Sequence, residues 1–574
     1  FDNQYAAEGA AQIKVQKVLD GRPWTKDDEF TFTLTAAEGT PMPNTTSVTI
    51  TKADADNTKS FGTIAYTLAD LGGEASKTFT YTVTETKPAE EDDKDEGRLE
   101  YDTTEHTVTI TVKDDGQGRI VADTDSNLIQ TVTITNTYTP DTPTFEKKIA
   151  DINDSTDTEQ GDWEDSADYD IGDLVPYKLS ATLAKDVSTY KKYHVTFEDQ
   201  MEDTLEFNSI QQVTVNGAVL DASAYTFKKL SNQKFELRVD FENTKAIYGN
   251  KSLDSGVVEV FFNAKLLDTA KLGKEGNVNG ARLRYSHNPL SEDDSDEDEE
   301  STEWDYVIAF TYKVDVSKVD EDEEALEGAK FKLEKVIKDA ENQELALTVK
   351  GNVFTATGLD DGDYILTETK APTGYKPIDP ITFTVTATHN DWDANNSGEA
   401  ANFAIDGRND VLTALTGDKE TGTLRLVADD DLKGLAGSIE NRKLGALEIT
   451  KNVTVDGKAV TANDFAKVDG DYTFSIQNED ASVTKTATVT IKDGKASTAK
   501  VEDLPAGTYT VSETDSKGLV PDQASKTVEV QDGKTAKVAT VDFTNNLPGT
   551  PTFEKKIKDT NDSTGETSDW QDSA

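Results

Sequence analysis

Three segments of the chain repeat a pattern of tyrosine, an apolar residue and glutamate at every second position. The pattern occurs as Tyr81-Val83-Glu85, Tyr364-Leu366-Glu368 and Tyr509-Val511-Glu513. Residues two apart in a β-strand share one face, and the tyrosine and the apolar residue mark this face as buried. Because an unpaired carboxylate inside a core is very costly, each glutamate is expected to have a buried partner.

Candidate partners stand at inward-facing positions of an early and a late strand around each glutamate. The early strands supply the lysines Lys17, Lys318 and Lys451, and the late strands supply the asparagines Asn136, Asn441 and Asn545. A fourth set uses an aspartate and consists of Lys147, Asp199 and Asn279. Asn277 and Asn288 are alternatives there, but Asn279 shares its register with Ala281, Leu283 and Tyr285.

Lysine, a carboxylic acid and asparagine can together form a covalent cross-link. Burial lowers the pKa of a lysine and raises that of a carboxyl group. A neutral amine can then attack the asparagine side-chain carbon while the acid carries the proton, which expels ammonia and leaves an isopeptide bond. This chemistry happens once in each domain, so we expect no turnover enzyme. The simpler interpretation of any single set is a buried ion pair, or surface residues whose register is misread.

The elements that position these residues are predicted to be β-strands. Alternating threonine and apolar residues, as in FTFTLT, TFTYTVTE and ITFTVTAT, indicate half-buried antiparallel strands. Asp-Gly and Asn-Gly pairs supply hairpin turns between them. The predicted fold class is therefore all-β, with tandem immunoglobulin-like β-sandwiches in an elongated rod.

Composition excludes several classes of protein. The chain has 574 residues and a net charge of −52, which disfavours nucleic acid and anionic membranes as partners. It has no cysteine and four histidines, so disulfides, thiolate metal sites and most histidine-based catalysis are excluded. No apolar run is long enough to insert into a membrane.

One sequence occurs twice. TPTFEKKIADINDST at 142–156 returns as TPTFEKKIKDTNDST at 550–564. Residues 549–574 are therefore expected to start a repeated domain whose remainder is missing, and the chain is expected to be a piece of a longer array. Asp151-Asn153-Ser155-Asp157 and the acidic run at 291–300 have oxygen ligands for calcium but lack the glycine of a calcium loop, so no cofactor is expected.

These residues resemble the isopeptide-forming domains of Gram-positive pilins and adhesins. Residues 1–139 (KVLDGRPW, YTVTETK) and 444–548 (YTFSI, LPAGTYTVSET) resemble pilin isopeptide-linkage domains. Residues 140–311 (TPTFEKKI, YHVTFEDQM) resemble the larger domain of fimbrial shaft proteins. Residues 312–443 resemble a CnaB-type domain, with GDYILTETKAPTGYKPI as its pilin E box. The resemblance implies the bonds Lys17–Asn136, Lys147–Asn279, Lys318–Asn441 and Lys451–Asn545, promoted by Glu85, Asp199, Glu368 and Glu513.

The function that the resemblance implies is structural. We expect a stalk of an extracellular, cell-wall-associated adhesin or pilus-like protein, anchored through a C-terminal region absent from this sequence. Its partners are expected to be neighbouring domains of the same chain. LPGT at 547–550 resembles a sortase signal but is interpreted as a linker, which favours a single-chain stalk over a polymerised shaft. The alternative function is a ligand-binding adhesin region that recognises a host glycan or matrix protein.

Overall fold

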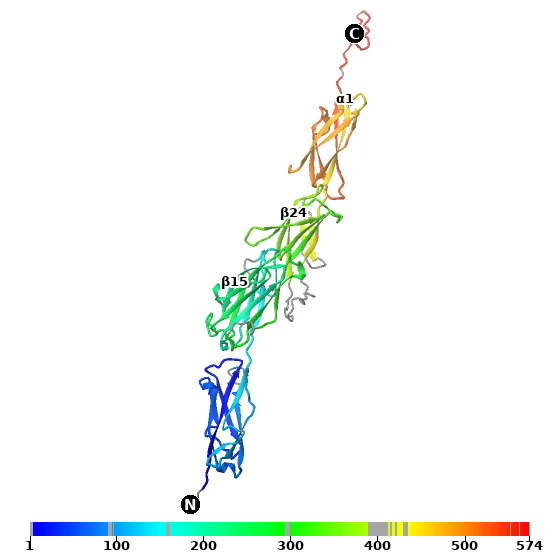
Figure 1. Cartoon of the computed structure of the whole chain (residues 1–574). Helices are drawn as coiled ribbons and strands as arrows, with labels where there is room; N and C mark the ends of the chain where they lie inside the picture. Colours follow the sequence, from blue (N-terminus) through cyan, green and yellow to red (C-terminus); the bar gives the residue numbers. More distant parts are fainter. Residues whose placement is uncertain are drawn as a thin grey trace. The chain divides into compact units, whose positions relative to one another are not determined.

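Strands make up nearly all of the regular structure, which confirms the all-β prediction (Figure 1). The structure is a computed structural model that describes residues 4–89, 95, 97–124, 126–156, 161–292, 299–388, 411–413, 416–419, 422–428, 434–551, 553–558, 560–561 and 563–572. The helices of this part of the chain are short: η1 (Ala55–Asn57), η2 (Leu68–Leu71), η4 (Val187–Thr189), η5 (Ala222–Ala224), η6 (Gly273–Glu275) and α1 (Phe465–Val468). None of them has the length and apolar character to cross a membrane.

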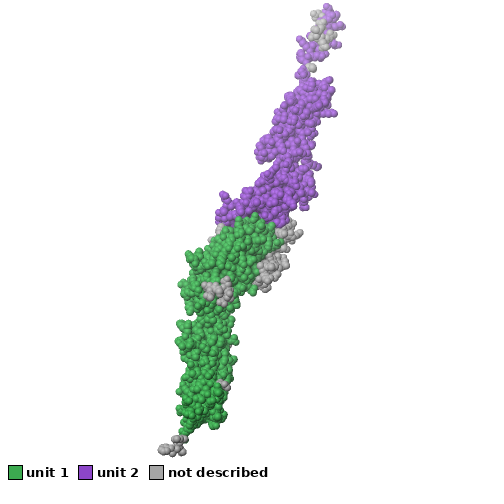
Figure 2. Space-filling model, in the orientation of Figure 1, with its two compact units in different colours: residues 1–152, 159–311, 389–410 green, residues 153–158, 312–388, 411–574 purple. Residues whose placement is uncertain are grey.

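The chain divides into two compact units (Figure 2). The first contains residues 1–152 and 159–311, and the second contains residues 153–158, 312–388 and 411–574. Each unit holds two pairs of β-sheets, which we call the first to fourth sandwich in chain order. The short segment 153–158 thus lies in the second unit, although the residues on both sides of it lie in the first.

The first sandwich brings the first and last strands of the domain together as parallel neighbours. One sheet contains, in spatial order, β4 (Thr58–Thr67), β1 (Glu8–Asp20), β9 (Ile129–Tyr138) and β6 (Leu99–Glu100). The other contains β3 (Ser47–Thr51), β2 (Glu29–Ala36), β5 (Ser76–Thr86), β7 (His106–Asp114) and β8 (Ile120–Ala122). In β2, the alternating sequence FTFTL buries Phe30, Phe32 and Leu34 between the sheets. The strand pattern therefore aims every second residue at the core, as expected for a period of two.

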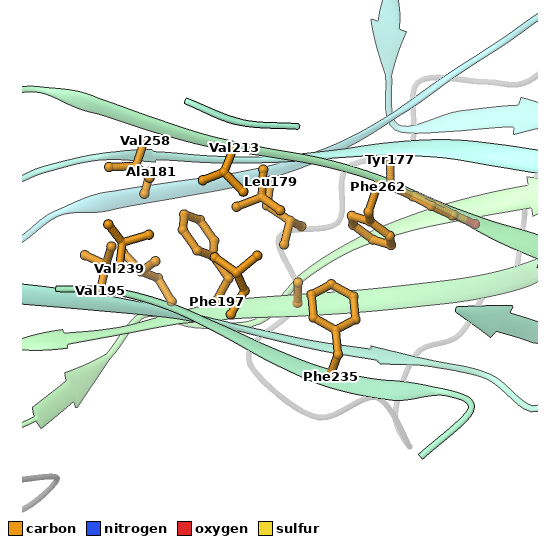
Figure 3. Close-up of a cluster of buried hydrophobic side chains, with 14 of the residues drawn as sticks. Tyr177, Leu179, Ala181, Val195, Phe197, Val213, Phe235, Val239, Val258 and Phe262 are labelled. Atoms are coloured by element: carbon orange, nitrogen blue, oxygen red, sulfur yellow. The ribbon is translucent and has the colours of Figure 1, made fainter. Parts of the chain in front are cut away.

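The second sandwich has two larger sheets. One contains β11 (Trp163–Glu164), β10 (Thr144–Ala150), β13 (Leu174–Thr182), β19 (Val257–Leu266), β15 (Leu205–Val215) and β16 (Ala218–Val219). The other contains β12 (Ser166–Asp168), β22 (Asp305–Phe310), β20 (Asn277–Ser286), β14 (Tyr193–Met201), β18 (Lys234–Phe241) and β17 (Thr226–Lys229), and β21 (Glu299–Ser301) pairs with β20. Buried side chains from both sheets meet between them, including Leu179, Phe197, Phe235 and Phe262 (Figure 3).

The third sandwich again pairs its first and last strands in parallel. One sheet contains β26 (Thr348–Lys350), β27 (Val353–Leu359), β23 (Tyr312–Val319), β33 (Gly434–Glu440), β32 (Gly422–Ala428) and β31 (Thr416–Lys419). The other contains β25 (Gln343–Leu345), β24 (Lys330–Lys335), β28 (Gly362–Lys370), β29 (Ile381–Thr388) and β30 (Val411–Thr413). The rings of Phe331 and Phe354 meet edge to face, with centroids 4.7 Å apart, and so join the two sheets.

The fourth sandwich follows the plan of the first and third. Its first sheet contains β35 (Lys458–Ala459), β34 (Gly445–Val455), β43 (Ala539–Leu547) and β41 (Val520–Pro521), and β39 (Ala499–Leu504) also pairs with β34. The second contains β38 (Lys495–Ala496), β37 (Thr484–Lys492), β36 (Gly470–Asn478), β40 (Gly507–Asp515) and β42 (Ser525–Val530). Beyond it lies one short hairpin of β44 (Lys556–Ile557) and β45 (Gln571–Asp572).

Candidate cross-linking sites

The same strand register places lysine and asparagine in the first, third and fourth sandwiches. In the first, Lys17 of β1 pairs with Ile134 of the parallel strand β9, and Asn136 stands two residues further along. The corresponding residue pairs are Lys318 with Ile439 in the third sandwich and Lys451 with Phe543 in the fourth. Residues two apart in a strand share a face, so each asparagine points to the side of the sheet that its lysine occupies.

In the first sandwich, Glu85 reaches across from β5 in the opposite sheet and contacts both residues. The Lys17 Nζ atom donates to Glu85 Oε2 at 2.8 Å, and the Asn136 Nδ2 atom donates to Glu85 Oε1 at 3.0 Å. All three side chains are buried. One carboxyl group therefore bridges the nucleophile and the leaving group of the predicted reaction.

Burial also shifts the protonation of the first site toward reactivity. Desolvation lowers the pKa of Lys17 and raises the pKa of Glu85, and their mutual contact opposes both shifts. The nearby charge of Asp102 raises both pKa values. A lowered lysine pKa and a raised carboxyl pKa bring closer the form with a neutral amine and a protonated acid, which the reaction needs.

The fourth sandwich repeats this geometry. The Lys451 Nζ atom lies 2.9 Å from Glu513 Oε1, and the Asn545 Nδ2 atom donates to the same oxygen at 3.0 Å. Glu513 extends from β40, opposite the sheet of β34 and β43. Desolvation lowers the pKa of Lys451. The site therefore brings together all three residues that the sequence analysis selected.

In the third sandwich, the acid contacts the asparagine, while the lysine is bonded to the backbone. The Asn441 Nδ2 atom donates to both oxygens of Glu368 at 3.0 Å, and the Ile378 N–H also donates to Glu368. The Lys318 Nζ atom donates instead to the carbonyls of Val319 and Ile439. Desolvation lowers the pKa of Lys318 to about 8 and raises that of Glu368.

The second sandwich arranges its residues differently. Lys147 lies on β10 in one sheet, whereas Asp199 and Asn279 lie on the neighbouring antiparallel strands β14 and β20 of the other. The Lys147 Nζ atom donates to Asp199 Oδ2, and all three residues are fully buried. A bond here would join the two sheets, whereas a bond in the other three sandwiches would join neighbouring strands of one sheet.

Electrostatics and hydrogen bonding single out Asn279 in the second sandwich. Desolvation raises the pKa of Asp199 to about 6 and lowers that of Lys147. The side chain of Asn279 lies close enough to Asp199 to oppose part of this rise. The Asn277 side chain is instead bonded to the backbone of Lys271 and Ala309. The Asn277 side chain is therefore engaged in other hydrogen bonds, and Asn279 remains the predicted partner.

Two features of the sites were not found by sequence reasoning. Aromatic rings lie beside three of the lysines. The distance from the lysine Nζ atom to the ring centroid is 4.9 Å for Lys17 and Phe30, 5.0 Å for Lys147 and Tyr177, and 5.3 Å for Lys451 and Tyr472. The sequence signal that could have indicated these rings is their inward position in alternating strands. These rings exclude water, which favours the neutral amine, while their faces attract the charged form.

The second feature is a backbone donor present at one site. In the first sandwich, the Asp102 N–H donates to the Asn136 Oδ1 atom at 2.9 Å. Within the described residues, the buried Oδ1 atoms of Asn279, Asn441 and Asn545 have no hydrogen-bond partner. Because Asp102 lies just beyond β6 and not on an alternating strand, no sequence pattern indicated it.

The two candidate calcium stretches have different outcomes. Residues 293–298 of the acidic run, and Asp157, lie outside the described residues. In the other stretch, the Asn153 Oδ1 atom accepts from the N–H groups of Ser155 and Thr156, and the Ser155 Oγ atom donates to a carbonyl. These oxygens serve hydrogen bonds that shape and hold a turn. The expectation of no bound cofactor stays a prediction.

Comparison with known protein families agrees with this geometry. Residues 13–139 match the model of the Spy0128-like isopeptide containing domain (FctA), and residues 312–398 match that of the SpaA prealbumin-like fold domain. Residues 447–548 match a domain of unknown function, DUF5979. These two segments are therefore similar to an isopeptide containing domain and to a prealbumin-like fold domain.

The chain is homologous to a streptococcal surface protein. It is 25% identical over 239 residues to the trypsin-resistant surface T6 protein of Streptococcus pyogenes serotype M6, a match that covers 38% of this chain and 42% of the relative. The match thus spans less than half of that protein. Among solved structures, the T6 backbone pilin is 18% identical, with 76% of this chain and 99% of that chain covered and a TM-score of 0.34. The group B streptococcus pilus 2b backbone protein is 20% identical, with 52% and 97% covered and a TM-score of 0.33.

Proposed function

We propose that this chain is a structural segment of a pilus shaft or pilus-like stalk, stiffened by one Lys–Asn isopeptide bond in each of its four sandwiches. The observation that carries the proposal is the contact of Glu85 with both Lys17 and Asn136 inside the first core. The matches to isopeptide and prealbumin-like domains, and the homology to the T6 protein, support the same function.

The reaction proposed for the first sandwich follows from its contacts. The neutral Nζ atom of Lys17 attacks the side-chain carbon of Asn136 and forms the new C–N bond. Glu85 takes a proton from the attacking nitrogen and delivers one to the leaving amide nitrogen, so the old C–N bond breaks and ammonia leaves. The carboxyl group ends in its starting form, and one amide replaces another. Asp199, Glu368 and Glu513 are proposed to promote the corresponding reactions in the other sandwiches.

Such bonds would suit a chain that bears tension. Force enters each sandwich through its terminal strands, and a covalent bond between Lys17 of β1 and Asn136 of β9 would carry that force past the rest of the domain. The bond would also close a loop of roughly 120 residues, and closure of a loop of about 100 residues stabilises a fold by about 4.7 kcal/mol in the chain-entropy treatment. Unlike a disulfide, the bond cannot be reduced. A location on the cell surface, with anchorage outside this sequence, belongs to the same proposal.

Peptide mapping tests the proposal site by site. Protease digestion of the full chain followed by tandem mass spectrometry should yield four branched peptides, joining Lys17 to Asn136, Lys147 to Asn279, Lys318 to Asn441 and Lys451 to Asn545. Glu85→Ala should abolish only the first of these peptides. Glu100→Ala, which changes an exposed glutamate of the same sandwich, is the matched control and should leave all four. Linear peptides alone, from folded protein, would contradict the proposed function.

A further inference from the structure

A four-residue turn between β10 and β11 packs against the third sandwich. Residues 153–156, with the sequence Asn-Asp-Ser-Thr, belong to the same compact unit as that sandwich. The Asn153 Oδ1 atom accepts from the N–H groups of Ser155 and Thr156 and so fixes the turn. This closed turn presents the Asp154 carboxylate, the Ser155 hydroxyl and two backbone carbonyls to the sandwich.

The turn makes five polar contacts with the ends of β24 and β28. The Asp154 carboxylate accepts from the Lys335 Nζ atom at 2.9 Å. The Ser155 Oγ atom donates to the Val336 carbonyl and accepts from the Asp363 N–H, each at 2.8 Å. The backbone carbonyls of residues 154 and 156 accept from the N–H and Nζ groups of Lys338. The carboxylate, the hydroxyl and the two carbonyls of the turn thus each form a hydrogen bond with this surface.

The receiving surface is built around a buried charge and a glycine. The Lys335 side chain is fully buried and also donates to the buried Asp360 carboxylate at 2.5 Å. Gly362 has a φ of +142°, and a Cβ atom there would lie 2.7 Å from the Ser155 Oγ atom. The glycine therefore leaves room for the serine hydroxyl, and the turn covers one side of the lysine.

The fourth sandwich has the same framework without this receiving surface. Lys335 pairs with Tyr364, as Asn478 pairs with Tyr509. The tyrosine hydroxyls donate to the backbone carbonyls of Asp360 and Pro505 at 3.0 and 2.9 Å, so these positions also correspond. A Cβ atom on Gly507, the counterpart of Gly362, would meet nothing within 4 Å. The third sandwich thus has Lys335 and Asp360 beside its docked turn. The fourth sandwich has Asn478 and Pro505 at the corresponding positions.

The second copy of the repeated sequence forms the same turn. At residues 561–564, the Asn561 Oδ1 atom accepts from the Ser563 N–H at 3.0 Å, and its carbonyl accepts from the Thr564 N–H at 3.2 Å. The first copy has the corresponding bonds at 3.0 and 3.1 Å. Asn561, Ser563 and Thr564 are exposed. The described residues of this copy thus make the hydrogen bonds of the turn while they are exposed, so binding requires little ordering of the ligand.

We propose that the surface formed by Lys335, Val336, Lys338, Gly362 and Asp363 is a recognition site for an Asn-Asp-Ser-Thr turn. Its occupant in this chain is residues 153–156, and residues 561–564 repeat the sequence of that occupant. The site is independent of the isopeptide bonds, because none of its residues takes part in the proposed reaction. The third sandwich thus completes one end of its structure with a segment that precedes it by more than a hundred residues in the chain.

Hydrogen exchange of the full chain tests the site. In the double variant Asp154→Ala/Ser155→Ala, the Asp363 N–H loses its acceptor, so peptides covering residues 360–366 should exchange at least about tenfold faster near that amide. The control Asp221→Ala/Ser223→Ala removes a similar turn in the second sandwich and should leave these peptides unchanged. Unchanged exchange in the first variant would overturn the proposal.

A peptide added to the variant tests recognition itself. The probe is residues 558–566, Lys-Asp-Thr-Asn-Asp-Ser-Thr-Gly-Glu, and its control replaces the second Asp and the Ser with Ala. At millimolar concentration, the probe should restore slow exchange at 360–366 in the double variant, and the control peptide should not. Restoration by both peptides, or by neither, would overturn the proposal. The Lys318–Asn441 peptide of the same samples reports the isopeptide proposal separately.

Discussion

Lys17 and Asn136 extend from neighbouring parallel strands, and Glu85 of the opposite sheet bonds to both of them. The asparagine stands two residues beyond the direct partner of the lysine, a relationship that the third and fourth sandwiches share. The acid therefore always approaches from the facing sheet in these three domains. In the second sandwich, the lysine lies on one sheet, and the acid and the asparagine both lie on the other. Two different architectures thus lead to the same set of functional groups.

The first sandwich should form its bond sooner than the other three. Its Asn136 carbonyl accepts a hydrogen bond from the Asp102 N–H, which stabilises the negative charge that develops on that oxygen during attack. Asp102→Pro removes the donor and should slow the first bond by roughly tenfold or more. The measurement is a time course of branched peptides after cell-free synthesis of the chain.

The control for this prediction keeps the donor and removes the side chain. Asp102→Ala retains the backbone N–H, so the first bond should still form early. Equal rates for the proline and alanine variants would show that the backbone donor has no part in the reaction.

The two architectures should differ under force. In the first sandwich, nine residues of β1 precede Lys17 and two residues of β9 follow Asn136, so about 11 residues, or ~40 Å, can extend with the bond intact. In the second, β21 and β22 follow Asn279, and about 30 residues should extend by ~100 Å with the bond intact. Single-molecule pulling of the full chain should show this short step.

Glu85→Ala provides the comparison within the pulling experiment. Without its bond, the roughly 120 residues between Lys17 and Asn136 become extensible, and a new step of ~400 Å should appear. The short step of the second sandwich should remain. A long step in the unmodified chain would contradict a bond in the corresponding domain.

The pH dependence of bond formation should differ between the second and third sandwiches. The reactive form holds one proton on the acid and none on the amine. The reaction therefore stops when the lysine–acid pair loses this proton and also when it gains a second one. Burial raises the pKa of Asp199 to about 6, above its ordinary value, so below pH 6 the acid and the lysine are both protonated and the second bond should form more slowly. Burial lowers the pKa of Lys318 to about 8, so above pH 8 the lysine–acid pair holds no proton and the third bond should form more slowly.

Refolding experiments can measure both limits. Chain from cell-free synthesis is collected unfolded in urea before it reacts. It is then refolded between about pH 4 and about pH 10, a range that brackets the shifted pKa values of about 6 for Asp199 and about 8 for Lys318. Branched peptides of the two sandwiches are then counted over time. Asp199→Ala and Glu368→Ala supply the backgrounds. Rates without any pH dependence would show that these groups do not carry the proton.

Removing the acid should cost the first sandwich more stability than removing the asparagine. Both Glu85→Gln and Asn136→Ala prevent the bond, but only Glu85→Gln leaves the buried Lys17 without a charged partner. Breaking a buried pair in this way costs about 3 to 5 kcal/mol. When urea unfolding is followed by hydrogen exchange of β5, the free energy of unfolding of Glu85→Gln should be lower than that of Asn136→Ala by about this amount. Equal stabilities would show that Lys17 is neutral or hydrated in the unlinked domain.

Much of this structure was accessible from the sequence because period-two patterns carry positional information. The alternation around Tyr81, Val83 and Glu85 fixes which face of β5 is buried, and the structure buries all three. The residues selected for the first and fourth sites lie in contact for the same reason. Their role in a reaction remains a prediction that the experiments above address.

Other features depend on contacts between segments that no local pattern describes. The bonds of Lys318 to backbone carbonyls follow from the exact path of β23 and β33, and the Asp102 donor comes from a loop. The docking of residues 153–156 joins segments far apart in the chain, so the repeated sequence gave no indication of a binding site. Such long-range relationships require the folded chain.

The most direct test of the central claim is the intact mass of the unmodified chain. Four isopeptide bonds expel four molecules of ammonia, so the measured mass should fall below the summed residue masses by roughly 68 Da. Each of Glu85→Ala, Asp199→Ala, Glu368→Ala and Glu513→Ala should restore about 17 Da beyond the mass change of the substitution itself. A folded chain whose mass equals the sum of its residues would contradict the cross-linking account.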